Sequence, residues 1–271
     1  MTDGADRTSY PPPDHILSAL GIEFAWRTDA VLDGRVQVDP VRLRRDPATP
    51  PGIGPLVPIV DVIAGACVSK HVDGDWMATA DVWLNEREPL GTDPITLTAT
   101  LLRAGKRSLV SSIEVLSGTV PAAHATVEFS RIRREASPHT GRPAAADGTW
   151  RRMGEGDLLD RPIEEACGIR VVDPATGMAE VDRAPFVANS IGTLQGGVVA
   201  LLADVSAAAV VGPNARTIDL QFRFLAQTGA GPARASAEVI RTDADGTVVG
   251  VEVIDAADDT RVGWAICRVV G

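Results

Sequence analysis

The sequence predicts an α+β fold of two similar units in tandem, each made of one long buried helix and an antiparallel meander of strands. The first observation behind this prediction is an internal repeat. When Asp81 is placed on Asp219, the segments that follow run on without a gap, and an ungapped block upstream places Asp61 on Asp204. Other matched pairs are Val38 with Val181, Pro94 with Pro232, Arg103 with Arg241, and Glu114 with Glu252. A chain of 271 residues can bury two modest cores packed together.

The second observation is a long apolar helix in each copy. Residues 195–211 are apolar nearly all round, so the helix that they predict must be buried on most sides. Residues 55–69 predict its partner in the first copy, with Pro55 near the helix start, where proline is well tolerated. A short helical segment is expected ahead of each long helix, at about 15–20 and 157–167.

The third observation is the strand pattern that follows each helix. In residues 95–101, apolar side chains alternate with threonines, which is typical of a half-buried strand. Gly105 and the pair Asp245-Gly246 supply turns, after which residues 109–116 and 248–254 are expected to return antiparallel. Residues 125–132 and 262–270 predict a closing strand in each copy.

Composition shifts along the chain predict where the units begin and end. Residues 1–13 are polar and end in three prolines, so we expect a loose tail. Residues 135–156 are rich in Pro, Gly, Ala and Arg, which is typical of a linker. The predicted units are therefore residues 14–134 and 157–271.

Charge and composition narrow the classes of function. A formal net charge of −10 argues against wide contact with nucleic acid, because neutralising phosphates needs a dense basic face. No apolar run is long enough to cross a bilayer, and the first residues lack the pattern of a secretory signal, so we expect a cytoplasmic protein. The three cysteines lie far apart, without the spacing of a disulfide framework or a metal site, and no metal is expected.

A local group of arginines departs from this acidic balance. It comprises Arg131, Arg133, Arg134, Arg142, Arg151 and Arg152. One interpretation is solvated linker charge. The other is a seat for the phosphates of a nucleotide-bearing ligand, in which Arg131 and Arg133 bind substrate.

The loop before the second long helix carries the most specific motif. It reads Asn189-Ser190-Ile191-Gly192-Thr193-Leu194-Gln195-Gly196-Gly197, and Asp204 follows seven residues after the second glycine. This spacing resembles the signature of acyl-CoA thioesterases of the phenylacetate-pathway type, in which Asn, Gly, His-Gly-Gly and an acid on the helix recur. Gln195 stands where that family usually has histidine.

The resemblance extends to the order of elements over nearly the whole chain, twice. Members of that family have the hotdog fold, in which an antiparallel sheet wraps a long central helix. The resemblance therefore implies two tandem hotdog domains that form an intrachain pseudo-dimer, a covalent version of the usual hotdog dimer. A homo-oligomer of such double units is a further expectation that stays open.

The chemistry of this loop suits hydrolysis of a thioester. The N–H groups of Gly196 and Gly197 would begin a helix, where free amides meet the positive end of the helix dipole. They are expected to hold the thioester oxygen as it gains charge. Because Gly192, Gly196 and Gly197 carry no side chains, substrate is expected to approach the loop closely. Gln195 and Asn189 would orient the loop or a water molecule. The alternative is a helix N-cap loop that only needs glycine.

Two acidic residues interrupt the apolar helices at matched positions. Because an unpaired buried carboxylate is costly, Asp61 and Asp204 must each meet a partner or line a cleft. The alternative is an aspartate satisfied by backbone donors. In hotdog thioesterases of this type, the carboxylate of one subunit works with the Asn and glycine loop of the other, with a hydroxyl residue beside the acid. The group that the resemblance implies here is Asp61, Thr79, Asn189, Gln195 and Gly196.

The reciprocal site would set the first-copy loop against Asp204 and Thr217, and there the match fails. The residues that stand in place of Asn189, Gly192, Gln195 and Gly196 are Asp46, Thr49, Gly52 and Ile53. The isoleucine crowds the approach, and the following Gly54-Pro55 removes one N–H donor. We therefore predict one competent site and one decayed site, with Asp204 and Thr217 as its relic.

The leading hypothesis is hydrolysis of an acyl-CoA or acyl-carrier-protein thioester at a single site between the two halves. Asp61 would act as nucleophile or as general base on water. No cofactor is expected beyond the coenzyme A of the substrate. A second hypothesis is a non-catalytic hotdog protein that binds acyl-CoA as a sensor or scaffold. A hydratase or dehydratase ranks third, because that chemistry ordinarily uses an Asp/His pair in this loop, which holds no histidine.

Overall fold

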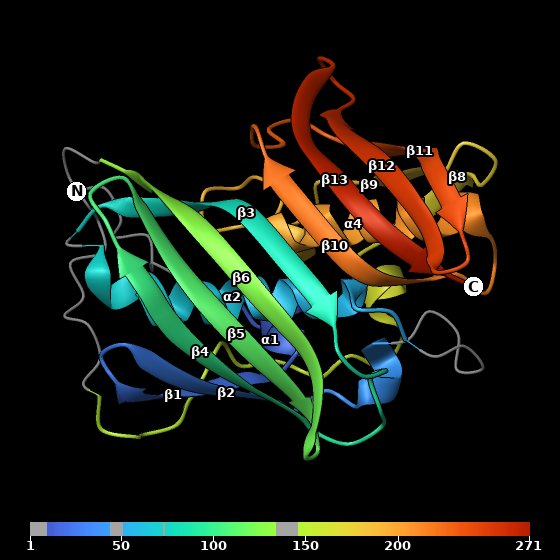
Figure 1. The fold of residues 1–271 in the computed structure, drawn as a ribbon. Coiled ribbons are helices and arrows are strands. Elements are labelled where there is room, and N and C mark those ends of the chain that lie inside the picture. Colours follow the sequence, from blue (N-terminus) through green and yellow to red (C-terminus); the bar gives the residue numbers. More distant parts are fainter. Residues whose placement is uncertain (1–9, 44–50, 73, 134–145) are drawn as a thin grey trace.

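The computed structural model describes residues 10–43, 51–72, 74–133 and 146–271, and in them thirteen strands form one antiparallel sheet (Figure 1). The first half of the sequence supplies β1 (Ile22–Thr28), β2 (Val31–Val36), α2 (Val57–Val68), β3 (Trp76–Glu86), β4 (Ile95–Ala104), β5 (Ser108–Ser117) and β6 (Val120–Ile132). The second half supplies β8 (Arg170–Asp173), β9 (Met178–Val181), α4 (Gly196–Val211), β10 (Arg216–Phe224), β11 (Ala233–Asp243), β12 (Gly246–Asp255) and β13 (Thr260–Val270). The short elements are α1 (Ile16–Ala19), β7 (Arg151–Arg152) and α3 (Ile163–Ala166).

The strand order is the same in the two halves of the sheet. After β7, the order is β1-β2-β4-β5-β6-β3, and from the opposite edge it is β8-β9-β11-β12-β13-β10. Register shifts recur at matched positions. The pairing of β3 with β6 shifts between Thr79 and Asp81, and that of β10 with β13 shifts between Thr217 and Asp219. Residues matched in the sequence therefore occupy the same place in both halves.

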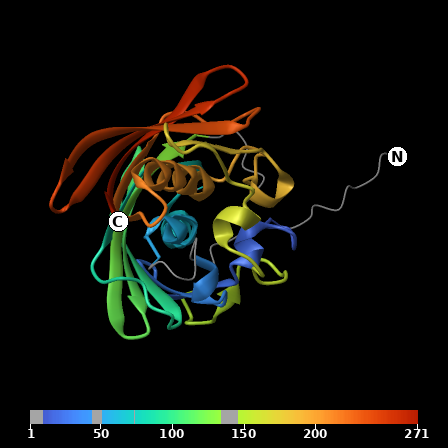
Figure 2. The same ribbon diagram turned by 90° about the vertical axis from the view of Figure 1, so that its right-hand side faces the viewer.

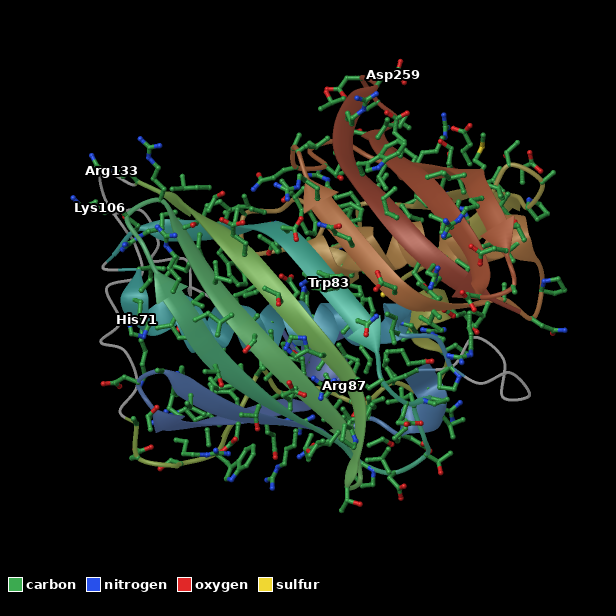
Figure 3. All side chains as sticks on the ribbon, in the orientation of Figure 1. His71, Trp83, Arg87, Lys106, Arg133 and Asp259 are labelled. Carbon is green, nitrogen blue, oxygen red and sulfur yellow. The ribbon has the colours of Figure 1, made fainter. Side chains whose placement is uncertain are left out.

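The two halves meet where β3 pairs with β10 (Figure 1). This pairing is centred on Trp83 opposite Gln221, which are themselves matched residues of the repeat. Side chains also bridge this seam, since the amide of Asn85 donates to the carboxylate of Asp219 at 2.8 Å. Trp83 lies on the outer face of the sheet, where it is exposed (Figure 3). The backbone ladder thus makes one continuous sheet of the two halves.

Both long helices lie inside the curve of the sheet and contact each other (Figure 2). α2 packs on β4 and β5, and α4 packs on β11, so most residues of either helix are buried. Their starts meet at Gly197, where a Cβ atom would overlap the backbone of Pro58. Only glycine permits this approach of the two helices.

The bounds of the two long helices agree closely with those expected from the sequence, whereas the short helix expected at 157–167 is confined to Ile163–Ala166. α4 spans Gly196–Val211, with Gln195 as its N-cap. α2 begins at Val57, two residues later than expected, because Gly54–Leu56 forms a 3-10 turn that contains Pro55. The first short helix is capped by the ring of His15, which accepts a hydrogen bond from the Leu17 N–H.

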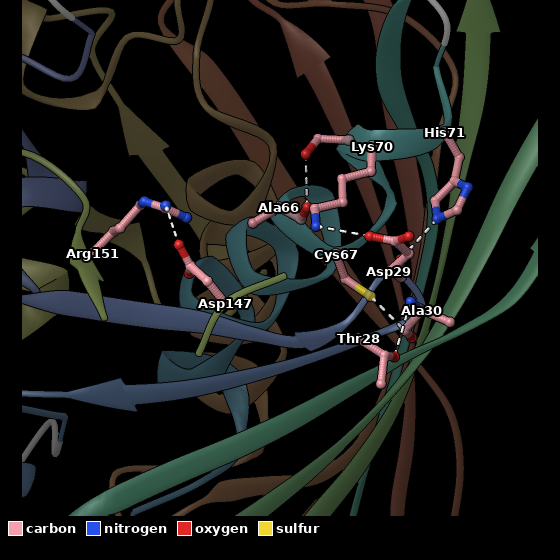
Figure 4. Close-up of polar contacts among 10 residues, drawn as sticks. Thr28, Asp29, Ala30, Ala66, Cys67, Lys70, His71, Asp147 and Arg151 are labelled. Atoms are coloured by element: carbon pink, nitrogen blue, oxygen red, sulfur yellow. Dashed lines mark hydrogen bonds and ion pairs between the residues drawn. The ribbon is translucent and has the colours of Figure 1, made fainter. Parts of the chain in front are cut away.

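The far end of α2 is tied to the turn between β1 and β2 (Figure 4). The Lys70 ammonium lies 3.1 Å from the Asp29 carboxylate, and the His71 ring contacts the Asp29 carbonyl at 2.9 Å. These contacts hold the helix that carries Asp61 against its own half of the sheet.

Two segments outside the predicted units join the structure. Arg151–Arg152, in the segment assigned to the linker, pairs with β1 as strand β7. Tyr10, in the segment assigned to the tail, lines a cleft beside α2. None of the helices in the described ranges is long and apolar enough to cross a membrane.

Candidate active site

Asp61 lies in the second turn of α2, and its carboxylate is buried, with the residue only 6% exposed. The Thr79 hydroxyl on β3 donates to one carboxylate oxygen at 2.7 Å. The side-chain amide of Gln195 donates to the other at 2.9 Å, and the backbone N–H of Gly197 donates as well. The structure thus brings together an acid from the first half and the helix start of the second.

Gln195 is oriented by the helix that it caps. Its side-chain oxygen accepts a hydrogen bond from the Val198 N–H at 2.9 Å, which satisfies one of the free amides at the start of α4. Because the oxygen is committed to this N–H, the side-chain NH2 group must face Asp61. The cap therefore fixes the amide as a hydrogen-bond donor to the carboxylate.

The environment of Asp61 sets its protonation. Burial raises the pKa of Asp61 to about 6, and the hydrogen bonds from Thr79, Gly197 and Gln195 oppose that rise. A carboxylate with this pKa is mostly ionised at neutral pH and is a stronger base than an ordinary aspartate. Such tuning is typical of acids and bases that act in catalysis.

Asn189 shapes the loop that precedes α4. Its side-chain oxygen accepts from the backbone N–H groups of Ile191 and Thr193, at 3.1 and 3.0 Å. Its NH2 group donates to the Thr193 hydroxyl at 2.6 Å. Gly192 adopts φ +82°, a conformation that a side chain would strain. Of the two roles left open for Asn189, the structure supports that of holding the loop.

A cleft of about 300 Å3 opens beside Asp61, and Gly196 forms part of its wall. A Cβ on Gly196 would lie 3.5 Å from the Asp61 carboxylate, so this amide and the acid border the same space. Most of the remaining wall is apolar and includes Val62, Trp76, Met77, Val199, Phe224 and Val262. A hydrocarbon chain can therefore be buried next to a reactive carboxylate.

Comparison with known proteins yields no match to a family model and none to a curated sequence. Solved structures do match. A provisionally assigned thioesterase from Novosphingobium aromaticivorans superposes with a TM-score of 0.62 at 13% identity, over 91% of this chain and 97% of that one. An acyl-CoA thioesterase II from Mycobacterium marinum gives 0.58 at 11% identity, over 94% and 97%.

A protein of unknown function with a hotdog fold, from Alicyclobacillus acidocaldarius, gives a TM-score of 0.56 at 15% identity, over 94% of this chain and 96% of that one. The chain has the hotdog fold. At these identities the likeness extends to the architecture, and the chemistry has to be argued from the residues of this chain.

At the matched position on the other side of this hotdog structure, the loop lies directly against the acid. A Cβ on Gly54, which matches Gly197, would overlap the carboxyl group of Asp204. The N–H of Ile53, which matches Gly196, already donates to the Thr217 carbonyl at 3.0 Å. Asp46 and Thr49 lie outside the described residues.

The two arginines considered for phosphate binding lie away from the lining of the cleft. The Arg131 guanidinium donates to the Gly105 carbonyl at 3.1 Å and lies 3.5 Å from the Asp75 carboxylate. Arg133 is exposed near Lys106, at the same end of the hotdog sheet (Figure 3). A role of either residue with substrate phosphates stays a prediction.

Sequence reasoning missed the first-half residues that support the loop. The His15 ring contacts the Ala188 carbonyl at 2.7 Å, and its other nitrogen accepts the Leu17 N–H. Tyr10 packs edge-on against His15, and burial together with the Asp61 charge raises the pKa of its phenol, which stays protonated. No local pattern marks these residues, because their partner Ala188 lies more than 170 residues away.

Proposed function

We propose that this chain hydrolyses the thioester of an acyl-coenzyme A, or of an acyl carrier protein, at a single site between two fused hotdog units. The observation that carries the proposal is the position of Asp61. Its buried carboxylate bonds across the halves to Gln195, at the amide-bearing start of α4 and on the wall of an apolar cleft. The Mycobacterium marinum neighbour with this architecture is an acyl-CoA thioesterase, which supports the reaction class.

Asp61 retains capacity for one more hydrogen bond. A carboxylate offers about four lone-pair positions, and Thr79, Gln195 and Gly197 donate to it. The remaining position can accept from a water molecule in the cleft. The same oxygen can attack a carbonyl carbon directly, so the geometry serves a general base and a nucleophile alike.

The chemistry balances on either route. With water as the attacking group, its oxygen bonds to the thioester carbon, Asp61 takes the proton, the carbon–sulfur bond breaks, and the proton passes to the leaving thiolate. With Asp61 as the nucleophile, a mixed anhydride forms as the thiolate leaves, and water then cleaves it. The N–H of Gly196 would stabilise the oxyanion on both routes, at roughly 3 kcal/mol for one such donor.

Thiol release from a series of acyl-CoA substrates tests this function. We expect Asp61→Asn to lower kcat by about 10^3-fold, because the base or nucleophile is lost. The fold should survive, since the asparagine oxygen can accept from Gln195 while its NH2 group donates to the Thr79 hydroxyl. Circular dichroism and unfolding curves check that the variant is folded.

The matched control is Asp204→Asn, which alters the acid at the matched position on α4. We expect it to retain turnover. Loss of activity in Asp204→Asn with full activity in Asp61→Asn would contradict the assignment of the site.

The presence of Gln195 in place of histidine favours a second candidate, a protein that binds acyl-CoA without hydrolysing it. Gln195 has no proton to exchange at neutral pH, so it cannot act as an acid or base. Tight binding of acyl-CoA by the unaltered protein, without thiol release for any chain length, would support this candidate over hydrolysis.

A further inference from the structure

The side chain of Thr228 is a buried hydroxyl on the wall of the cleft. Thr228 is 1% exposed, and within the described part of the chain its oxygen has no hydrogen-bond partner. It lines the same cleft as Asp61 and Gly196. A hydroxyl in this state costs free energy in the empty protein, because it has left water without gaining a partner.

The loop that carries Thr228 is held in place. The carboxylate of Asp255 accepts hydrogen bonds from the N–H groups of Ala230 and Gly231, both at 2.9 Å. The N–H of Ala226, on the other side of Thr228, donates to the Val262 carbonyl at 3.1 Å. These bonds hold the backbone on both sides of Thr228, so the loop keeps this residue at the wall of the cleft.

The first copy of the repeat has an apolar residue at the position of Thr228. The ungapped match that places Pro94 on Pro232 also places Leu90 on Thr228. Leu90 is buried, at 4% exposure, and fills its surroundings with apolar atoms. The fold thus accepts leucine here, and a hydroxyl occurs only in the copy whose loop borders the open cleft.

We propose that Thr228 is a substrate-binding residue whose hydroxyl donates to an oxygen of the bound thioester. Two parts of such a substrate offer that oxygen: an oxygenated acyl group, or an amide carbonyl of the pantetheine arm. The inference rests on the proposed function. It adds a polar contact to a wall that is otherwise mostly apolar, and so a means to select among acyl thioesters.

The test measures binding in the Asp61→Asn background, where substrate is not consumed. Decanoyl-CoA and 3-hydroxydecanoyl-CoA are titrated by calorimetry into proteins with Thr228, Thr228→Val or Thr228→Ser. We expect Thr228→Val to weaken binding about tenfold, as the loss of one hydrogen bond does. Thr228→Ser keeps the hydroxyl and should bind as the parent does.

The two ligands identify the source of the oxygen. A loss confined to the hydroxylated ligand assigns the contact to the acyl group, and an equal loss for both assigns it to the pantetheine arm. Unchanged binding of both ligands by Thr228→Val would overturn the inference.

The matched control is Ser111→Ala, at another buried hydroxyl without a partner in the described chain, away from the cleft. Both Thr228→Val and Ser111→Ala should raise the thermal midpoint of the empty protein, by about 2 °C. Only Thr228→Val should weaken binding. An equal effect of the two variants on binding would also overturn the inference.

Measurements of turnover distinguish a failure of the proposed function from a failure of this inference. If the unaltered protein binds these ligands but releases no thiol, hydrolysis fails while the role of Thr228 is still decided by the titrations. If thiol is released and Thr228→Val binds normally, the inference alone fails.

Discussion

Asp61 is a buried carboxylate that three parts of the chain supply with donors. The Thr79 hydroxyl comes from β3, the Gln195 amide from the cap of α4, and the Gly197 N–H from its first turn. Burial disfavours the charge and the donors favour it. Because burial has the larger effect, the pKa settles at about 6, and the group is ionised at neutral pH yet able to take up a proton.

The pKa of Asp61 predicts how catalytic activity depends on pH. We expect kcat/KM for an acyl-CoA to rise with pH and to level off above about 6, because only ionised Asp61 can act as base or nucleophile. Thiol release measured across that range checks it. Thr79→Val removes a donor that lowers the pKa of Asp61, so its midpoint should move to higher pH. A midpoint that stays in place in Thr79→Val would contradict this account.

Gln195 makes the kind of hydrogen bonds that a histidine could make at this position. A neutral histidine has one donor and one acceptor nitrogen. Gln195 offers the same pair, since its oxygen caps the Val198 N–H and its NH2 group bonds to Asp61. Glutamine thus supplies one donor and one acceptor here, and unlike histidine it does not titrate near neutral pH.

The two long helices differ at a matched position that borders the cleft on α2. Gly65 lies one turn beyond Asp61 on α2 and lines the cleft. The matched residue on α4 is Ala208, which is 1% exposed. Glycine inside a helix costs about 1 kcal/mol relative to alanine. A glycine on the helix that borders the cleft therefore indicates that the cleft needs the volume that a side chain would fill.

Substitutions at Gly65 test this use of space. A Cβ at Gly65 would lie 3.6 Å from Met77 and Phe129, an ordinary contact, so Gly65→Ala should raise the free energy of unfolding by about 1 kcal/mol. Gly65→Leu should fill the cleft and shift turnover towards shorter acyl chains. Denaturant unfolding and a chain-length series measure the two effects.

The reciprocal variant Ala208→Gly is the control for Gly65. It should lower the free energy of unfolding by about 1 kcal/mol and leave the chain-length preference unchanged. An unaltered preference in Gly65→Leu would show that substrate does not occupy this part of the cleft.

At the scale of the whole molecule, the candidate site draws its residues from both halves. Asp61 and Gln195 are 134 residues apart in sequence, and the shared β3–β10 ladder and the contact of α2 with α4 set their relative positions. At the matched position, Gly54 lies directly against the Asp204 carboxyl group. A repeated fold has thus kept its symmetry in the sheet and lost it at the two loops.

This asymmetry predicts binding of one acyl-CoA per chain. Calorimetric titration of the Asp61→Asn protein should give a molar ratio of about one, because the N–H of Ile53, which matches Gly196, is already bonded to the Thr217 carbonyl. Addition of Asp204→Asn should leave the ratio unchanged. Two molecules per chain would show that the position at Asp204 also binds ligand.

The sequence by itself determined the features that depend on local pattern. Hydrophobic periodicity and turn residues marked the long helices and the meander strands, and the repeat showed that each half has the same plan. An acid inside an apolar helix and a glycine pair at a helix start were visible because each is costly or unusual where it stands.

The family resemblance implied that Asp61, Thr79 and Gln195 form one group, and the tertiary structure brings them together. Only the tertiary structure decided which residues border them, because it placed Tyr10 and Thr228 on the wall of the cleft. The physical reason is that local pattern encodes whether a side chain is buried. Its partners come from distant segments, and packing across the whole fold selects them.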